Sequence, residues 1–434
     1  MVDHMDYGEL KPEGYIPRIA DQRLSHLLDT FGAVEVAGTM WCGKTWTSLA
    51  FGQSVSRMGL AGPRAAAAAD PTIALLGARP HVIDEWQDVP AIWDEVRAAV
   101  DASSNMPGSF VLTGSSEPRK ERVHHSGAGR IAKLRMRTMT LSELGISSGA
   151  VSLGTLFEGH FEPQLVQQSL PPLARAICKG GWPALAGRDV ASAEYLDAYF
   201  DAIFSVSIPR RGLSGIESRR VALSLARNLG SAVRLATIAS DAQLGETDSK
   251  AAANKAAEHI AALQELYVVE SVTGWDAPIR SKTRLRTKPK RYFADPSLAA
   301  ALLQVTPARL FEDGQLFGLL FESLCMHDLA VYASVLEGAS ADPLHYYRDS
   351  DGLEVDAVIE LRDGRWAAFE MKLGENQVRS AAASLNRLAR KVAANPAARN
   401  PAPEFLAVIV GAGENARFDR ELGVYVLPIT SLCA

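Results

Sequence analysis

The sequence is short of cysteine, and its four cysteines lie far apart. Cys42, Cys178, Cys325 and Cys433 form no C-x-x-C pair, which argues against a zinc knuckle and against a dense disulfide framework. Such sparse usage is typical of a reducing cytoplasm, where we expect this protein. No 18-residue apolar run is apparent and the first residues are polar, so we expect neither a membrane span nor a signal peptide.

An excess of charge of one sign is also lacking. Among 434 residues, 45 Lys and Arg nearly balance 50 Asp and Glu, and the formal net charge is −5. The protein as a whole is not a polycation, so any contact with nucleic acid has to come from a local basic face. The hydrophobic fraction of 47% is enough for packed cores and excludes global disorder. At about 150 residues a domain, the length predicts roughly three domains.

Strand-like and helical patterns alternate through residues 1–150 and predict a parallel α/β sheet. Residues 62–71 are interpreted either as a loop or as a weak helix. The expected helices span residues 19–30, 46–57 and 91–100, and the expected strands span residues 33–37, 73–76, 81–83 and 110–113.

A glycine-rich phosphate-binding motif, G-x-x-x-x-G-K-T, occupies residues 38–45 between an expected strand and an expected helix, which is the context that this motif requires. Glycines let the backbone wrap closely around a phosphate, and the helix N-terminus supplies positive potential. We expect Lys44 to contact the β- and γ-phosphates of ATP and Thr45 to bind Mg²⁺. The predicted nucleotide-binding residues are Gly38, Thr39, Met40, Trp41, Cys42, Gly43, Lys44, Thr45 and Trp46.

Two further strand ends carry polar residues suited to ATP hydrolysis. The run His81–Ile83 ends in Asp84 and Glu85, a Walker B pattern in which Asp84 would hold Mg²⁺ and Glu85 would polarise the attacking water. The run Phe110–Thr113 ends in hydroxyl residues, of which Thr113 is the first candidate to sense the γ-phosphate.

Arg130 follows as the candidate to stabilise transition-state charge, in cis or from a neighbouring subunit of a homo-oligomer. The basic residues Lys133, Arg135 and Arg137 alternate behind it. They are interpreted alternatively as a solvated strand face.

These segments together resemble prokaryotic AAA-type ATPases of the archaeal-ATPase-like group, which carry a C-terminal domain of unknown function. The resemblance implies an ATP-dependent factor, and such proteins are suspected of DNA-linked or defence-linked roles. Met40 and Trp41 are bulkier than generic residues of this loop. The motifs that carry the resemblance are FGAVEVAGTMWCGKTW, PHVIDEWQDVPAIWDEVR, FVLTGSS, HSGAGRIAKLRMRTMTLSELG, GGWPAL, YVVESVTGW, KRYFADPSLAAALL, LFESL, EVDAVIE and WAAFEMKLGE.

Residues 151–310 are predicted to form a helical, winged-helix-like domain. Helical patterns over 217–230 and 249–266 precede a strand-like run over 267–273. The basic segment 280–291 would act as a wing that contacts DNA phosphates, or would be a solvated loop, or would pack on the protein's own acidic ATPase domain. Its cations are Arg280, Lys282, Arg284, Arg286, Lys288, Lys290 and Arg291.

Residues 311–434 return to an α/β pattern with an acidic constellation. Glu322 lies in a helical pattern, Asp356 in a strand, and Glu370 and Lys372 two apart in the next strand, where they share a face. An acid, a strand and then E-x-K resembles restriction-endonuclease-like nucleases, in which the carboxylates would bind Mg²⁺ and the lysine would orient water. A solvated charge pair and a degenerate binding module are the alternatives.

The predicted fold is therefore α/β, with a P-loop NTPase of the AAA/ASCE type, a helical winged-helix-like middle domain and a restriction-endonuclease-like C-terminal domain. The first functional hypothesis is a Mg²⁺-dependent ATPase whose nucleotide state is coupled to binding of DNA or a partner protein. The alternatives are an ATP-regulated, metal-dependent DNA nuclease and a non-catalytic nucleotide-dependent switch that binds a protein.

Overall fold

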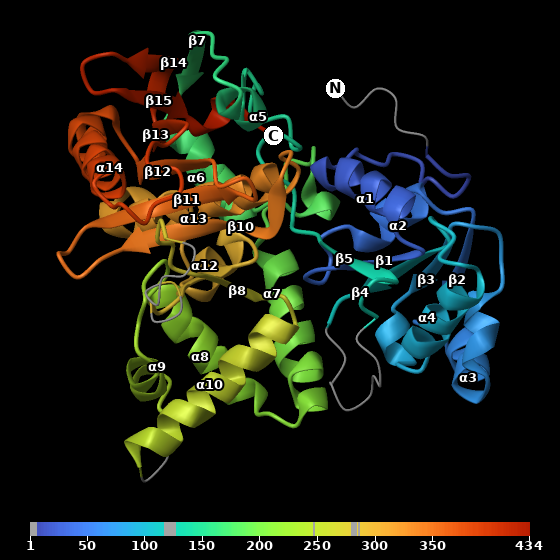
Figure 1. The fold of residues 1–434 in the computed structure, drawn as a ribbon. Coiled ribbons are helices and arrows are strands. Elements are labelled where there is room, and N and C mark those ends of the chain that lie inside the picture. The colour runs from blue at the N-terminus through green and yellow to red at the C-terminus, as the bar shows by residue number, and fades with distance from the viewer. Residues whose placement is uncertain (1–6, 117–126, 246–247, 279–283, 285–286) are drawn as a thin grey trace. The chain divides into compact units, whose positions relative to one another are not determined.

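The computed structural model describes residues 7–116, 127–245, 248–278, 284 and 287–434 (Figure 1). Its contacts divide the chain into two compact units. The first runs to Thr138 and includes the short segments Trp182–Ala184 and Glu265–Tyr267, and the second comprises the remainder. The middle and C-terminal parts thus share one unit, and the predicted boundary near residue 310 stays a prediction.

The first unit is built on a five-stranded parallel sheet whose order is β2-β3-β4-β1-β5. β4 lies between the strand before the phosphate-binding loop and the Walker B strand, as expected for an AAA/ASCE-type sheet. The strands are β1 (Ala33–Ala37), β2 (Ser54–Arg57), β3 (His81–Asp84), β4 (Phe110–Gly114) and β5 (Ile131–Arg135), and the helices are α1 (Ile19–Thr30), α2 (Lys44–Ala50), α3 (Ala61–Ala69) and α4 (Ile92–Ala102).

Helix α1 has the predicted bounds because Leu24, Leu27 and Leu28 repeat at helical spacing and are buried. The predicted helix over 46–57 is wrong in its second half, since α2 ends at Ala50 and β2 pairs with β3. Gly52 separates the two, and a Cβ there would lie 2.6 Å from Val82 Cγ2. The close approach of the chain at this point requires glycine.

The strand predicted over 73–76 is also wrong, because Pro71–Leu75 forms a 3₁₀ turn. Asp70 caps this turn, its carboxylate accepting from the Thr72 backbone N–H at 3.0 Å, and Pro71 takes the first position. Residues 62–71 lie mostly in α3, which decides for the helical interpretation.

The middle part of the second unit consists of helices followed by a two-stranded hairpin. The last three of these helices precede the hairpin in the order of a winged helix. The winged-helix fold itself stays a prediction. The helices are α5 (Leu153–Phe157), α6 (Leu170–Lys179), α7 (Ala193–Asp201), α8 (Gly215–Arg227), α9 (Leu235–Asp241) and α10 (Ser249–Glu265), and the hairpin pairs β8 (Val269–Val272) with β9 (Lys290–Phe293).

The C-terminal part contains a seven-stranded mixed sheet of order β10-β11-β12-β13-β15-β14-β7. β10, β11 and β12 are antiparallel neighbours, and β13 then lies parallel to β12. The elements are α12 (Pro296–Leu302), α13 (Gly314–Ser334), β10 (Ala339–Arg348), β11 (Glu354–Leu361), β12 (Trp366–Lys372), α14 (Val378–Ala393), β13 (Phe405–Val410), β14 (Gly413–Asp419) and β15 (Val424–Pro428), with β7 (Gln164–Gln168) at the edge and a short pair of β6 (Val151–Ser152) and β16 (Leu432–Cys433).

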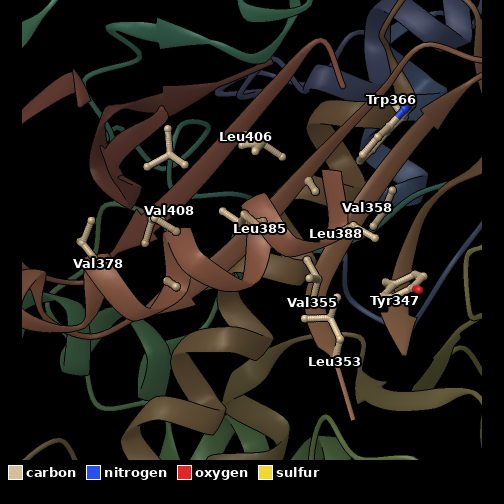
Figure 2. Packing of buried hydrophobic residues seen from close by; sticks show 14 of the residues in the cluster. Tyr347, Leu353, Val355, Val358, Trp366, Val378, Leu385, Leu388, Leu406 and Val408 are labelled. Carbon is tan, nitrogen blue, oxygen red and sulfur yellow. The ribbon is translucent and has the colours of Figure 1, made fainter. Parts of the chain in front are cut away.

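Helix α14 packs its apolar stripe on this sheet (Figure 2). Leu385 and Leu388 on the helix are fully buried in one cluster with Val358, Trp366 and strand β13. Burying such side chains is the main stabilising contribution to the sheet.

Helix α13 is the one helix in the described part of the chain that is long and apolar enough to cross a membrane. Of its most apolar window, 78% is buried inside the fold. Phe317, Leu320 and Phe321 on it are fully buried, so α13 is a core helix of the second unit.

Candidate functional site

The phosphate-binding loop lies where the sequence predicts, between the end of β1 and the start of α2. Gly43 has a φ of +104°, in the region that favours glycine. A Cβ on Gly38 would lie 2.1 Å from the carbonyl oxygen of Met136. Both glycines are therefore required by the path of the backbone.

Lys44, Thr45, Asp84 and Thr113 come together at the carboxyl ends of β1, β3 and β4. Lys44 is buried and its Nζ donates to the carbonyl oxygen of Thr39 at 2.7 Å. The hydroxyls of Thr45 and Thr113 donate to the same oxygen, Asp84 Oδ1, at 2.8 and 2.6 Å. Parallel pairing brings Asp84 opposite Thr113 on β4, so the sheet itself assembles this group.

Glu85 is held in a separate pair of contacts beside Asp84. Its Oε2 accepts from Ser115 Oγ at 3.0 Å and from Gln87 Nε2, and its backbone has a φ of +56°. The backbone N–H of Glu85 also donates to the Thr113 hydroxyl at 3.4 Å. Sequence reasoning missed Gln87, although its position two residues after the Walker B acids was a signal that could have been used.

The oxygen donors of this group fit a hard divalent cation. Mg²⁺ is bound in proteins by one or two carboxylates together with hydroxyl, water and substrate phosphate oxygens. Thr45 and Asp84 supply such a hydroxyl and carboxylate within hydrogen-bond distance of each other. Lys44, at the N-terminus of α2, adds the positive charge that a nucleotide phosphate needs.

Two aromatic residues of the predicted nucleotide site are partly exposed. Trp41 is 39% exposed and has a φ of +64°, and Trp46 is 49% exposed on the first turn of α2. Cys42, between them in sequence, is buried, which agrees with a packing role. Met40 is half-buried.

Arg18 lies near the loop and belongs to no motif that would select it from the sequence. Its guanidinium is buried and donates to the carbonyl oxygens of Cys42 and Arg137, each at 2.9 Å. Asp21, three residues on, is also buried and accepts from the hydroxyl of Tyr15 at 2.6 Å. Tyr15 in turn contacts Thr47 Oγ1 of α2 at 3.0 Å. The segment before α1 therefore braces the phosphate-binding loop.

Arg130 does not lie at the candidate site within this chain. Ile131, the next residue, pairs with Ala33 at the start of β1, whereas the phosphate-binding loop follows the other end of that strand. Arg130 Nε donates instead to Asp101 Oδ1 at 2.7 Å. A role of Arg130 toward a nucleotide, in cis or in trans, stays a prediction.

The basic residues after Arg130 are not simply a solvated face. The guanidinium of Arg135 lies 4.5 Å from the ring centre of Tyr267, and Lys133 Nζ lies 5.4 Å from the same ring. Such cation–π contacts stabilise a cation on an aromatic face. Tyr267 has a φ of +56° and belongs to the short segment that packs in the first unit.

Of the four C-terminal candidates, Asp356, Glu370 and Lys372 are in direct contact, and the fourth is Glu322. Lys372 Nζ donates to Glu370 Oε2 at 2.6 Å and to Asp356 Oδ2 at 3.3 Å. Asp356 Oδ2 also accepts from the backbone N–H of Met371 at 2.9 Å. Glu322 on α13 faces the same charges, because the Asp356 carboxylate contributes to its raised pKa.

Burial and the Asp356 charge raise the pKa of Glu322 to about 7 and that of Glu370 to about 8. Burial lowers the pKa of Lys372, but Asp356 and Glu370 outweigh it, so the net shift is upward. Among the described residues, no group of three or more His, Cys, Asp or Glu side chains is placed to hold a metal ion. A metal site at these carboxylates stays a prediction.

Two cations of the basic segment, Arg284 and Lys290, contact carboxylates. Arg284 makes a bidentate pair with Glu360, with distances of 2.7 and 2.9 Å. Lys290 contacts Glu322 and Glu354, whereas the side chain of Lys288 is exposed. Packing on the protein itself thus accounts for two of the cations, but the carboxylates belong to the C-terminal part and not to the ATPase domain. Arg280, Lys282 and Arg286 lie outside the described residues.

Comparison with known families divides the chain into three stretches. Residues 31–145 match an AAA domain, residues 171–309 match a domain of unknown function (DUF8612) and residues 317–432 match a second domain of unknown function (DUF4143).

The chain is similar to the uncharacterised proteins Mb2031c of Mycobacterium bovis and Rv2008c of Mycobacterium tuberculosis. The identity to each is 27% over 362 residues, which cover 82% of this chain and 73% of the relative. Among solved structures, a Walker-type ATPase of Pyrococcus abyssi aligns with a TM-score of 0.42 and 12% identity, over 68% of this chain and 98% of that one.

The AAA match covers the phosphate-binding loop, both Walker B acids and all strands of the first sheet. The second domain of unknown function covers α14 and the whole acidic constellation. The predicted P-loop fold and the predicted resemblance are thereby confirmed, apart from the restriction-endonuclease-like assignment. The chain therefore carries an AAA domain and a C-terminal domain of unknown function, as do the archaeal-ATPase-like AAA proteins that it resembles.

Proposed function

We propose that this protein is a Mg²⁺-dependent ATPase whose nucleotide state is coupled to binding of DNA or a partner protein through its middle and C-terminal parts. The observation that supports it most is the convergence of Thr45 and Thr113 on Asp84 Oδ1. One carboxylate oxygen that accepts from a hydroxyl on α2 and from a hydroxyl at the end of β4 is a prepared position for a cation and its water. Bound Mg²⁺ would neutralise charge on the β- and γ-phosphate oxygens.

Each residue of the nucleotide site then has a distinct role. Lys44 releases the Thr39 carbonyl and donates to phosphate oxygens, and Thr45 and Asp84 hold the cation. Glu85, kept apart from Asp84 by Ser115 and Gln87, accepts the proton of the attacking water. The hydroxyl of Thr113 donates to the Asp84 carboxylate and accepts from the Glu85 backbone N–H, and it orients the water.

Two substitutions separate binding from hydrolysis. Lys44→Ala is expected to abolish ATP binding, whereas Glu85→Gln is expected to retain binding and lose turnover. Asp88→Asn, an exposed acid three residues on, is the matched control and should hydrolyse ATP as the wild type does. Equal hydrolysis by Glu85→Gln and the wild type would contradict the assignment of Glu85.

Arg130 is proposed to act on the nucleotide of a neighbouring copy. A mixture of inactive Lys44→Ala and inactive Arg130→Ala chains should then recover ATPase activity, because each supplies what the other lacks. A wild-type monomer with full activity, or mixed oligomers without recovery, would contradict a role in trans.

For the C-terminal part we propose a restriction-endonuclease-like fold used for binding. The order α13, β10, β11, β12, α14, β13 and the gathering of Asp356, Glu370 and Lys372 support the fold. The alternative, an ATP-regulated nuclease, requires a divalent metal at carboxylates that are already paired with lysines. It predicts Mg²⁺- or Mn²⁺-dependent cleavage of linear, branched or single-stranded DNA that is lost in Asp356→Ala but not in Asp363→Ala, an exposed control.

A further inference from the structure

A second ammonium group enters the carboxylate cluster from a distant part of the sequence. Lys290, the first residue of β9, is only 3% exposed. Its Nζ lies 2.8 Å from Glu354 Oε1 and 3.4 Å from Glu322 Oε1. The ring of Tyr346 lies beside the same ammonium, at 5.2 Å. The β8–β9 hairpin therefore delivers a buried cation to the acids of α13 and β11.

The hairpin reinforces this contact two residues later. Tyr292 lies on the same face of β9 as Lys290, is buried, and donates its hydroxyl to Glu322 Oε1 at 2.6 Å. The side chains of Lys290 and Tyr292 thus converge on the same oxygen, Glu322 Oε1. β9 cannot slide by one residue without turning both side chains to its other face, so the pairing of Val272 with Lys290 sets the position of the ammonium.

Two lysines lie among the four carboxylates, and the exposed Arg348 adds a contact to Glu354 at 3.8 Å from the outside. Lys372 pairs with Asp356 and Glu370, and Lys290 pairs with Glu322 and Glu354. A buried ammonium is retained only where such partners offset its loss of hydration. Burial by itself lowers the pKa of Lys290, but the charges of Glu322, Asp356 and Glu354 outweigh burial, so the net shift of this pKa is upward. Lys290 is therefore charged at neutral pH. A divalent cation placed among these acids would face both ammonium groups.

We propose that the ammonium of Lys290 is the resident cation of this cluster in place of a divalent metal, and that the cluster locks the β8–β9 hairpin to the C-terminal sheet. The carboxylates that a nuclease would present to metal here bind a segment of the same chain. The inference is independent of ATP hydrolysis, which concerns other residues.

Binding of Mn²⁺ to the full-length, nucleotide-free protein, followed by electron paramagnetic resonance of free Mn²⁺, tests the proposal. The wild type and Asp356→Asn should bind equal amounts, since any Mn²⁺ at the ATPase site is common to both. Lys290→Met should gain one additional Mn²⁺ with at least tenfold tighter binding than the wild type shows there, and Lys290→Met/Asp356→Asn should lose it. Lys288→Met, an exposed lysine of the same hairpin, is the matched control and should gain none.

Hydrogen exchange of β8 and β9 amides reports the lock itself. Exchange in these strands should be at least tenfold faster in Lys290→Met than in Lys288→Met, and Lys290→Arg, which keeps a cation, should restore protection. A wild-type Mn²⁺ site that Asp356→Asn removes would overturn the proposal, and this comparison does not depend on whether Lys290→Met folds. A folded Lys290→Met protein with neither the new site nor faster exchange would overturn it as well.

Discussion

Removal of the Arg18 guanidinium is the sharpest test of how the phosphate-binding loop is held. Arg18→Ala deletes the donors to the carbonyl oxygens of Cys42 and Arg137, both at 2.9 Å, and Arg18 itself is 5% exposed. Cys42 precedes Gly43, whose left-handed conformation shapes the loop. We therefore expect the loss to act on nucleotide binding as well as on stability.

The magnitude follows from the two abandoned carbonyls. A buried polar group that loses its partner costs about 1–3 kcal/mol, so the loss of both partners should cost the first unit about 2–6 kcal/mol of stability. The part of this free energy that arises at the Cys42 carbonyl destabilises the phosphate-binding loop alone. Because 1.4 kcal/mol corresponds to a factor of ten, ATP affinity should fall roughly 5- to 100-fold.

Titration with a fluorescent ATP analogue measures this effect directly, and Arg18→Lys tests whether one donor suffices. Arg64→Ala is the matched control, because Arg64 makes only a partly exposed pair with Asp88 at 3.5 Å, and such pairs contribute little. An Arg18→Ala protein that melts earlier but binds the analogue like the wild type would show that Arg18 supports only the fold. That result would refute the reasoning.

Two further predictions concern the acids of the two units. Gln87→Ala removes one of two donors to Glu85 Oε2. Because this is the loss of one hydrogen bond to a charged group, kcat for ATP hydrolysis should fall about tenfold with KM unchanged. Steady-state kinetics in which only KM rises would contradict this prediction. Burial and Asp356 raise the pKa of Glu370 from 4.5 to about 8, so between these values the folded state binds more protons than the unfolded state and stability falls as pH rises. Melting temperatures at pH 5, 6.5 and 8 should therefore shift progressively in favour of Glu370→Gln over the wild type, and a constant difference would argue against the shift.

Much of the first unit could be predicted because its signals are local. The phosphate-binding loop and the Walker B acids are contiguous motifs, and α1 follows from the helical spacing of three leucines. The strand β2 could not be predicted, since it lies at the edge of the sheet, where three of its residues are half-buried and Arg57 is exposed, and it carries no strong apolar pattern. Edge strands are selected by their neighbours more than by their own composition.

The sequence by itself determined the nucleotide-binding motif, the acids that follow β3, and the E-x-K pair on β12, because each is encoded within a few residues. Only the tertiary structure decided that Arg18 braces the loop, that Arg130 immediately precedes β5 and pairs with Asp101, and that Lys290 is a buried partner of Glu322 and not a solvated wing residue. Arg18 contacts Cys42 and Arg137, which lie 24 and 119 positions away in the sequence. Lys290 contacts Glu322, which lies 32 positions away. Strand order and register bring them together, and a charge pattern read along one segment contains no information about which carboxylates the fold places opposite it.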